Sequence, residues 1–260
     1  MSGLLAAMPW RRPSSHRSGI GGPPPGSPVL DIWPQVLGSL YQDTGTATPV
    51  TAAGQTVRHA VDQSAGGHDA IQTDSTNAPQ YATGLGPGSN LAGLDFLSTG
   101  AHWLKVASFT SPATTYFFVY AVTSSTGTLF TRVRTSGGAA ADYVYKTGEI
   151  QGDRGTTRLL SNNGFFPNTS YHLGCLRIDP SGTNKIEAYL DGTMFTSSTL
   201  GIGTTDLDAS LLLGAHSELG NYPARLLLLR FLTYHTALDS TDRRAVEVYL
   251  QALYGTPALP

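Results

Sequence analysis

Apolar and polar residues alternate most regularly in Lys185–Leu190, where every second side chain is apolar. A period of two residues is typical of a half-buried β-strand. Asp191 and Gly192 follow, a pair that favours the two positive-φ positions of a tight turn. The pattern therefore predicts a hairpin in which Thr193–Phe195 returns beside the first strand.

Other strands are predicted by short runs of β-branched and aromatic residues between Gly-rich turns. Thr115–Val122 is almost continuously apolar, so we expect a central strand that is buried on both faces. Arg225–Leu232 contains four consecutive leucines, which favours a strand covered by a second sheet on one side and by a helix on the other. The remaining expected strands are Val29–Trp33, Thr128–Arg134, Asp142–Tyr145, Thr157–Leu160 and Ser210–Leu213.

One helix is predicted over residues 240–254. Its apolar stripe consists of Val246, Tyr249, Leu250 and Leu253, at spacings of one helical face. Ser240 is the expected N-cap, and Gly255 stands where a left-handed C-cap belongs. The pattern predicts an all-β fold, a two-sheet antiparallel sandwich with one C-terminal helix.

Residues 1–28 differ from the rest of the chain and predict an extended Pro/Gly-rich arm before a single domain over 29–260. The apolar residues precede the arginines, the reverse of a secretory signal, and three consecutive prolines favour a stiff spacer. We expect the arm to dock on a partner subunit through Trp10, Arg11, Arg12 and Arg17. A disordered tail is the alternative.

Composition excludes several classes of function. The formal net charge of -2 argues against nucleic acid as the ligand, because binding to a phosphate backbone needs a clustered positive surface. No stretch approaches the roughly 18 apolar residues that a membrane span needs, so we expect no membrane insertion. The single cysteine, Cys175, forms no internal disulfide and is expected to be a small buried apolar residue.

Two segments carry a resemblance to a known family. One segment, near the C-terminus, spans residues 232–255, LTYHTALDSTDRRAVEVYLQALYG. The other lies earlier in the chain and is marked by Leu40, Tyr41, Gln42, Asp43, Pro49, Val50, Thr51, Gly54, Val57, Asp62, Ser64, His68, Ala70, Gln72, Pro79 and Tyr81. Together they resemble the concanavalin A-like (LamG-like) jelly-roll proteins of tailed phages and bacteria. The resemblance covers about residues 30–255 and implies a jelly-roll sandwich.

The carboxylate pattern of the glucanases that share this fold is absent. Those enzymes place two glutamates and an aspartate on one strand as ExDxE, so that all three point into a cleft. The four glutamates of this chain, Glu149, Glu187, Glu218 and Glu247, are never at that spacing, and G-x-S-x-G is missing too. We therefore expect no enzymatic activity.

Binding sites are predicted only by analogy of fold. Loop carboxylates of lectin-like sandwiches often hold calcium, and Asp206 and Asp208 are candidates, with solvated loop acids as the alternative. Asp69 and Asp74 flank another loop, and no cofactor besides calcium is expected. The exposed-side candidates for glycan binding are Tyr189, Tyr143, Tyr145, Trp103, His216, Asn221 and Tyr222, each of which could instead be packing.

The resemblance implies a non-enzymatic structural protein of a tailed-phage virion, either a head fibre or decoration protein or a tail-fibre component. The arm would dock on other virion proteins of the capsid or tail. The sandwich would face outward and could adhere to host-surface polysaccharide. We also expect a homo-oligomer, because the surface has few charges. The alternative is a free carbohydrate-binding lectin module.

Overall fold

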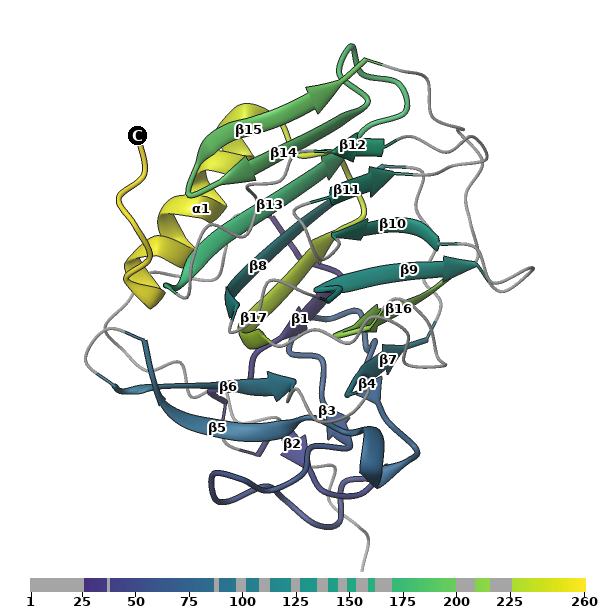
Figure 1. Cartoon of the computed structure of the whole chain (residues 1–260), viewed down its shortest axis with the longest axis vertical. Helices are drawn as coiled ribbons and strands as arrows, with labels where there is room; N and C mark the ends of the chain where they lie inside the picture. Colours follow the sequence, from purple (N-terminus) through teal and green to yellow (C-terminus); the bar gives the residue numbers. More distant parts are fainter. Residues whose placement is uncertain are drawn as a thin grey trace, which may run out of the picture.

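The computed structural model describes residues 26–36, 38–86, 89–96, 102–107, 113–122, 127–134, 140–144, 149–152, 159–161, 170–199, 209–215 and 226–260. These residues form two antiparallel β-sheets packed face to face, with a C-terminal helix against the first sheet (Figure 1). The expected β-sandwich is confirmed. Residues 1–25 of the expected arm lie outside the described residues.

Sheet A has the strand order β15-β14-β13-β8-β17-β6-β5, and β1 pairs with β17 beside this path. Its strands are β1 (Leu30–Ile32), β5 (Gln80–Leu85), β6 (Leu91–Phe96), β8 (Thr114–Val122), β13 (His172–Ile178), β14 (Ile186–Leu190), β15 (Thr193–Ser198) and β17 (Leu226–Tyr234).

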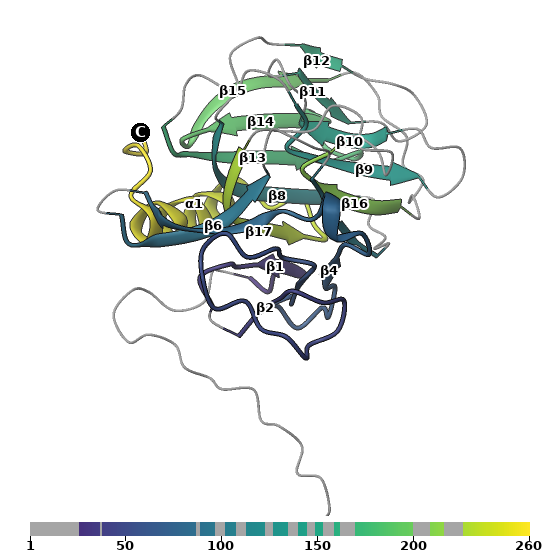
Figure 2. The same ribbon diagram turned by 60° about the horizontal axis from the view of Figure 1, so that its bottom comes forward.

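Sheet B has the order β12-β11-β10-β9-β16-β7-β4-β3-β2. Its strands are β2 (Leu40–Tyr41), β3 (His59–Ala60), β4 (Ala70–Ile71), β7 (Leu104–Val106), β9 (Phe130–Arg134), β10 (Ala140–Val144), β11 (Glu149–Gly152), β12 (Leu159–Ser161) and β16 (Ala209–Leu213). Figure 2 shows β2 and β4 at the end of the molecule away from β15. A short 3-10 helix, η1 (Ser75–Asn77), precedes β5.

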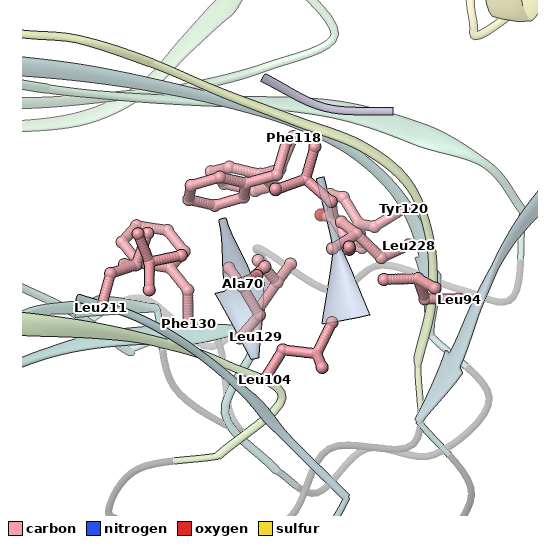
Figure 3. Close-up of a cluster of buried hydrophobic side chains, with 14 of the residues drawn as sticks. Ala70, Leu94, Leu104, Phe118, Tyr120, Leu129, Phe130, Leu211 and Leu228 are labelled. Atoms are coloured by element: carbon pink, nitrogen blue, oxygen red, sulfur yellow. The ribbon is translucent and has the colours of Figure 1, made fainter. Parts of the chain in front are cut away.

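The main core lies between the two sheets. Phe118 and Leu228 of sheet A face Phe130 and Leu211 of sheet B, and all four are fully buried (Figure 3). The near-continuous apolar run of β8 supplies this core on one face only. Its other face belongs to a second cluster, so the expectation of a central strand buried on both sides is confirmed.

The second cluster lies between sheet A and the helix α1 (Ser240–Tyr254). Val246 and Leu250 of α1 share it with Leu229 and Leu232 of β17. Neighbouring leucines of β17 face opposite sides by ordinary alternation, with Leu228 in the main core and Leu229 under the helix. A β-bulge between Leu228 and Arg230 then shifts the alternation, so that Phe231 faces the main core. The four-leucine run is therefore covered by a sheet on one side and a helix on the other, as predicted.

Local turn and cap signals are mostly confirmed. Asp191 and Gly192 adopt φ values of 47° and 75° in the β14–β15 turn. Gly255 ends α1 in the left-handed conformation. The expected N-cap, Ser240, is wrong by one residue. The N-cap is Asp239, whose carboxylate accepts hydrogen bonds from the N–H groups of Thr241 and Asp242.

The ends of the predicted strands differ from the observed ends by at most three residues, which is usual where pairing and not local pattern sets the end. The short strands β2 and β3 were not predicted, since residues 39–64 have little periodicity, and β4, β5, β7 and β11 were not predicted either. Cys175 is 1% exposed, which confirms its predicted burial. Within the described part of the chain, no helix has both the length and the apolar character needed to cross a membrane.

Candidate ligand-binding surface

Three of the four sheet faces are covered in the described part of the chain. The inner faces of sheets A and B pack on each other, and α1 covers the outer face of sheet A. The outer face of sheet B remains. Its β2, β3, β4 and β7 strands alternate, so that Leu40, Ala60, Ala70 and Val106 enter the core while their neighbours point outward.

Four outward residues stand opposite one another across these strands. Tyr41 pairs with His59, His59 with Ile71, and Ile71 with Lys105. We call these four residues the outer row. At the usual strand spacing the row is about 14 Å long. Tyr41, Ile71 and Lys105 are half-buried, so an aromatic, an aliphatic and a basic residue are each partly exposed along one line.

The Tyr41 ring is held in place. Its hydroxyl donates to the Gly38 carbonyl at 2.8 Å, and its ring centroid lies 5.9 Å from that of His59. The His59 ring is fixed as well, because Nδ1 lies 2.6 Å from the Gly45 carbonyl oxygen and Nε2 lies 2.8 Å from Asp69 Oδ2. The hydrogen bond to Asp69 raises the pKa of His59. A rigid aromatic ring can bind a ligand without losing conformational freedom.

The acidic residues of this region are used by the chain itself. The Asp62 carboxylate accepts hydrogen bonds from the Asp31, Ser64 and His68 N–H groups and from the Ser64 hydroxyl. Asp69 accepts the Asp62 N–H at 2.9 Å in addition to its contact with His59. The family-like residues Asp62, Ser64 and His68 therefore organise a loop, which requires a carboxylate at position 62.

No metal centre is found in the part of the chain that the structure describes, since no three His, Cys, Asp or Glu residues gather there as ligands would. Asp74 caps η1 by accepting the Thr76 N–H and hydroxyl. The calcium candidates Asp206 and Asp208 lie outside the described residues.

The centre of the outer face is covered. Lys105 pairs with Leu212, and Leu212 with Thr131, yet Leu212 and Thr131 are 0% exposed. Trp103 packs with Leu212 and Ala215 and is only 9% exposed. The prediction of Trp103 as an exposed platform is therefore corrected, because its indole serves as the apolar cover of β16.

Tyr189 is a second correction. It lies on the outer face of the β14–β15 hairpin, but α1 covers that face and leaves the ring 7% exposed. The Arg243 guanidinium stands 3.7 Å from the ring centroid. Burial raises the pKa of Tyr189 to about 12. The ring is a cation–π partner of the helix and is closed to ligands.

The remaining candidates are not brought to a site by the described structure. Position 143 lies in β10 opposite Thr131, which places it on the same line as the outer row, and its side chain is not described. Outside the described residues lie Tyr145, His216, Asn221 and Tyr222, and the arm residues Trp10, Arg11, Arg12 and Arg17.

The described glutamate side chains have structural partners. Glu187 accepts from Arg177 at 3.0 Å and from Asn184 at 2.9 Å. Glu247, on α1, is fully buried and paired with Arg243 and Arg244, and burial raises its pKa. Both carboxylates are therefore paired with arginines of the chain itself.

Comparison with known proteins defines the fold class. No family model and no curated protein matches the sequence. Among solved structures, the ligand-binding domain of botulinum neurotoxin serotype D, in complex with N-acetylneuraminic acid, aligns with a TM-score of 0.51 and 11% identity over 89% of this chain and 54% of that one. The receptor-binding domain of botulinum neurotoxin D aligns with a TM-score of 0.50 and 11% identity over 86% and 52%.

The chain thus spans about half the length of the neurotoxin chains that it matches. At this identity the similarity shows the fold alone, which is a lectin-like two-sheet β-sandwich.

Proposed function

We propose that this chain is a non-enzymatic carbohydrate-binding domain that binds glycans along the outer row of sheet B. The observation that carries the proposal is the outer row itself, with a fixed, half-exposed Tyr41 ring in line with Ile71 and Lys105. Glycans present C–H faces that pack on aromatic rings and hydroxyls that bond to polar side chains. The fold shared with a neurotoxin domain bound to N-acetylneuraminic acid supports the same function.

A glycan array probed with the full chain tests this function, and Tyr41→Ala tests its location. We expect Tyr41→Ala to weaken binding to the best glycan by roughly threefold to tenfold, because an aromatic contact is worth about 0.5–1.5 kcal/mol beyond its area. Titration of immobilised glycan with wild type and variant measures the change.

Tyr171→Ala is the matched control, since Tyr171 is also half-buried but packs on the helix side of sheet A. It should leave glycan affinity unchanged. If the full chain binds no glycan on the array, the proposed function is contradicted. If both variants lose the same affinity while their circular dichroism stays native, the glycan site does not lie on the outer row.

At a finer level, we propose that the domain belongs to a tailed-phage virion, where residues 1–28 dock on the particle and the sandwich faces outward. The support is the resemblance of residues 40–81 and 232–255 to such proteins and the cationic Pro/Gly-rich composition of the arm. The alternative is a free lectin module, whose glycan binding would be its whole role.

Mass determination in solution separates these two functions. The full chain and a chain lacking residues 1–28 are measured with and without purified particles. We expect only the full chain to form oligomers or to bind particles, while both chains keep the same glycan affinity. If both chains are monomers and neither binds the particles, the free lectin module is favoured.

A further inference from the structure

His59 is held between two groups that accept hydrogen bonds. Its Nδ1 lies 2.6 Å from the Gly45 carbonyl oxygen, which has no proton to give. Its Nε2 lies 2.8 Å from Asp69 Oδ2, and the other oxygen of Asp69 already accepts the Asp62 N–H. Both contacts are satisfied only when the imidazole and carboxylate together hold two protons, one toward Gly45 and one between His59 and Asp69.

The Gly45 contact joins sheet B to an otherwise self-contained loop. In residues 42–48 the Asp43 carboxylate accepts the N–H groups of Gly45 and Thr48, at 2.8 and 2.6 Å, and the Gln42 N–H donates to the Thr48 carbonyl. These bonds stay within the loop. The His59 bond is the described side-chain contact that fixes the middle of the loop to β3.

The charges around His59 favour its proton. Asp69 faces it from the segment before β4, and Asp43 faces it from the loop. The neutral Tyr41 ring covers it from β2, Ile71 stands opposite on β4, and Lys105 is one strand further along the outer row. Because the two facing charges are both negative, they oppose loss of the imidazolium charge.

We propose that His59 is a proton-dependent latch, which fixes loop 42–48 to sheet B while the His59–Asp69 pair holds two protons and releases the loop when one is lost. The remaining proton stays on Nε2, because a bond to a carboxylate is about twice as strong as a bond to a neutral carbonyl. Nδ1 then presents a lone pair to the Gly45 carbonyl, and that contact becomes repulsive. The proposal is independent of glycan binding.

The direction of the pH dependence follows from the raised pKa of His59. A cation stabilised in the folded state contributes fully below its ordinary pKa of 6.5. The contribution is lost as the pH rises through the higher folded value. The latch is therefore closed in acid and opens toward alkaline pH.

Side-chain ¹⁵N NMR of His59 and amide hydrogen exchange of Gly45 and Thr48, between pH 5.5 and 9, test the latch. We expect an imidazolium spectrum at low pH and an Nε2–H tautomer at high pH. The exchange rates, divided by those of an unstructured chain at the same pH, should rise about fivefold across the transition.

Two variants separate the latch from a merely structural histidine. His59→Gln should make exchange in the loop fast at every pH. Asp69→Asn should keep the loop closed at every pH, because the introduced amide can donate to a neutral Nε2 while Nδ1 keeps its proton for Gly45. His102→Gln, at a histidine that contacts the Ala78 carbonyl, is the control and should preserve the pH dependence.

A neutral His59 at pH 5.5, or exchange that does not change with pH in the wild type, would overturn the proposal. Asp69→Asn with the same pH dependence as the wild type would also overturn it.

Discussion

Replacing Asp31 by alanine is expected to lower the free energy of unfolding by about 3–5 kcal/mol, because the substitution leaves Arg230 as a buried charge without its counter-ion. Arg230 is 2% exposed, and it donates to both oxygens of Asp31, through Nε at 2.9 Å and through one terminal nitrogen at 2.7 Å. Its other terminal nitrogen donates to the Tyr249 hydroxyl at 3.1 Å. Trp33 covers the guanidinium group, whose central carbon lies 4.1 Å from the ring centroid.

Urea unfolding of the wild type, Asp31→Ala, Arg230→Met and the double variant Asp31→Leu/Arg230→Met measures the effect. Each single variant should be strongly destabilised, and the double variant should recover much of the loss, since a buried pair replaced by apolar residues costs little. Glu187→Gln is the comparison at a partly exposed pair with Arg177 and should cost about 1 kcal/mol or less. A loss for Asp31→Ala no larger than this would contradict the prediction.

The position of this ion pair explains why its effect should be large. β1 has three residues and pairs only with β17 in the described sheet. Asp31 also donates its N–H to Asp62 and accepts the Gln63 N–H at its carbonyl. The side chain and backbone of Asp31 therefore connect β1 to β17, to α1 through Arg230, and to the 62–68 loop. β1 is also where the predicted arm joins the domain, so a force on the arm would act on this pair.

Elements with a local signal were predicted well from the sequence. The β14–β15 hairpin, β8 and α1 each depend on alternation, on an apolar run or on cap residues that lie within the element itself. Residues 39–64 have no such signal. Their short strands are held by contacts between residues far apart, such as Asp62 with Asp31 and His59 with Gly45. The quoted family pattern marked several of these residues without indicating what they bind.

The candidate site was predicted less well, for a physical reason. Alternation shows that Tyr189 and Trp103 leave the core, but it does not show what covers the outer face. For Tyr189 the cover is α1, which begins 51 residues later in the chain, at Ser240. The sequence marks Tyr41 only as one residue of the family resemblance. Its place in the outer row follows from the pairing of β2, β3, β4 and β7, and pairing partners cannot be read from one strand.

Gly174→Ala is expected to lower the free energy of unfolding by about 1–3 kcal/mol through steric overlap in the core. Gly174 stands opposite Phe118 in the β13–β8 ladder, and a Cβ atom there would lie 2.0 Å from the Phe118 ring. The ring cannot move aside easily, because Tyr120 and Phe130 lie beside it (Figure 3), at centroid distances of 5.4 and 5.6 Å. Phe231 lies at a centroid distance of 6.4 Å. Thermal and urea unfolding measure the loss.

The double-mutant cycle with Phe118→Ala decides whether this overlap is the cause. Phe118→Ala alone should cost about 3–5 kcal/mol, because it opens a cavity between the sheets. In that background the methyl group of Gly174→Ala has room and fills part of the cavity, so its cost should vanish or reverse. Combined with Leu250→Ala, in the cluster under α1, Gly174→Ala should keep its full cost. Strict additivity with Phe118→Ala would mean that glycine is required at 174 for its backbone, whereas coupling confined to Phe118 means that the aromatic core of the sandwich excludes a side chain there.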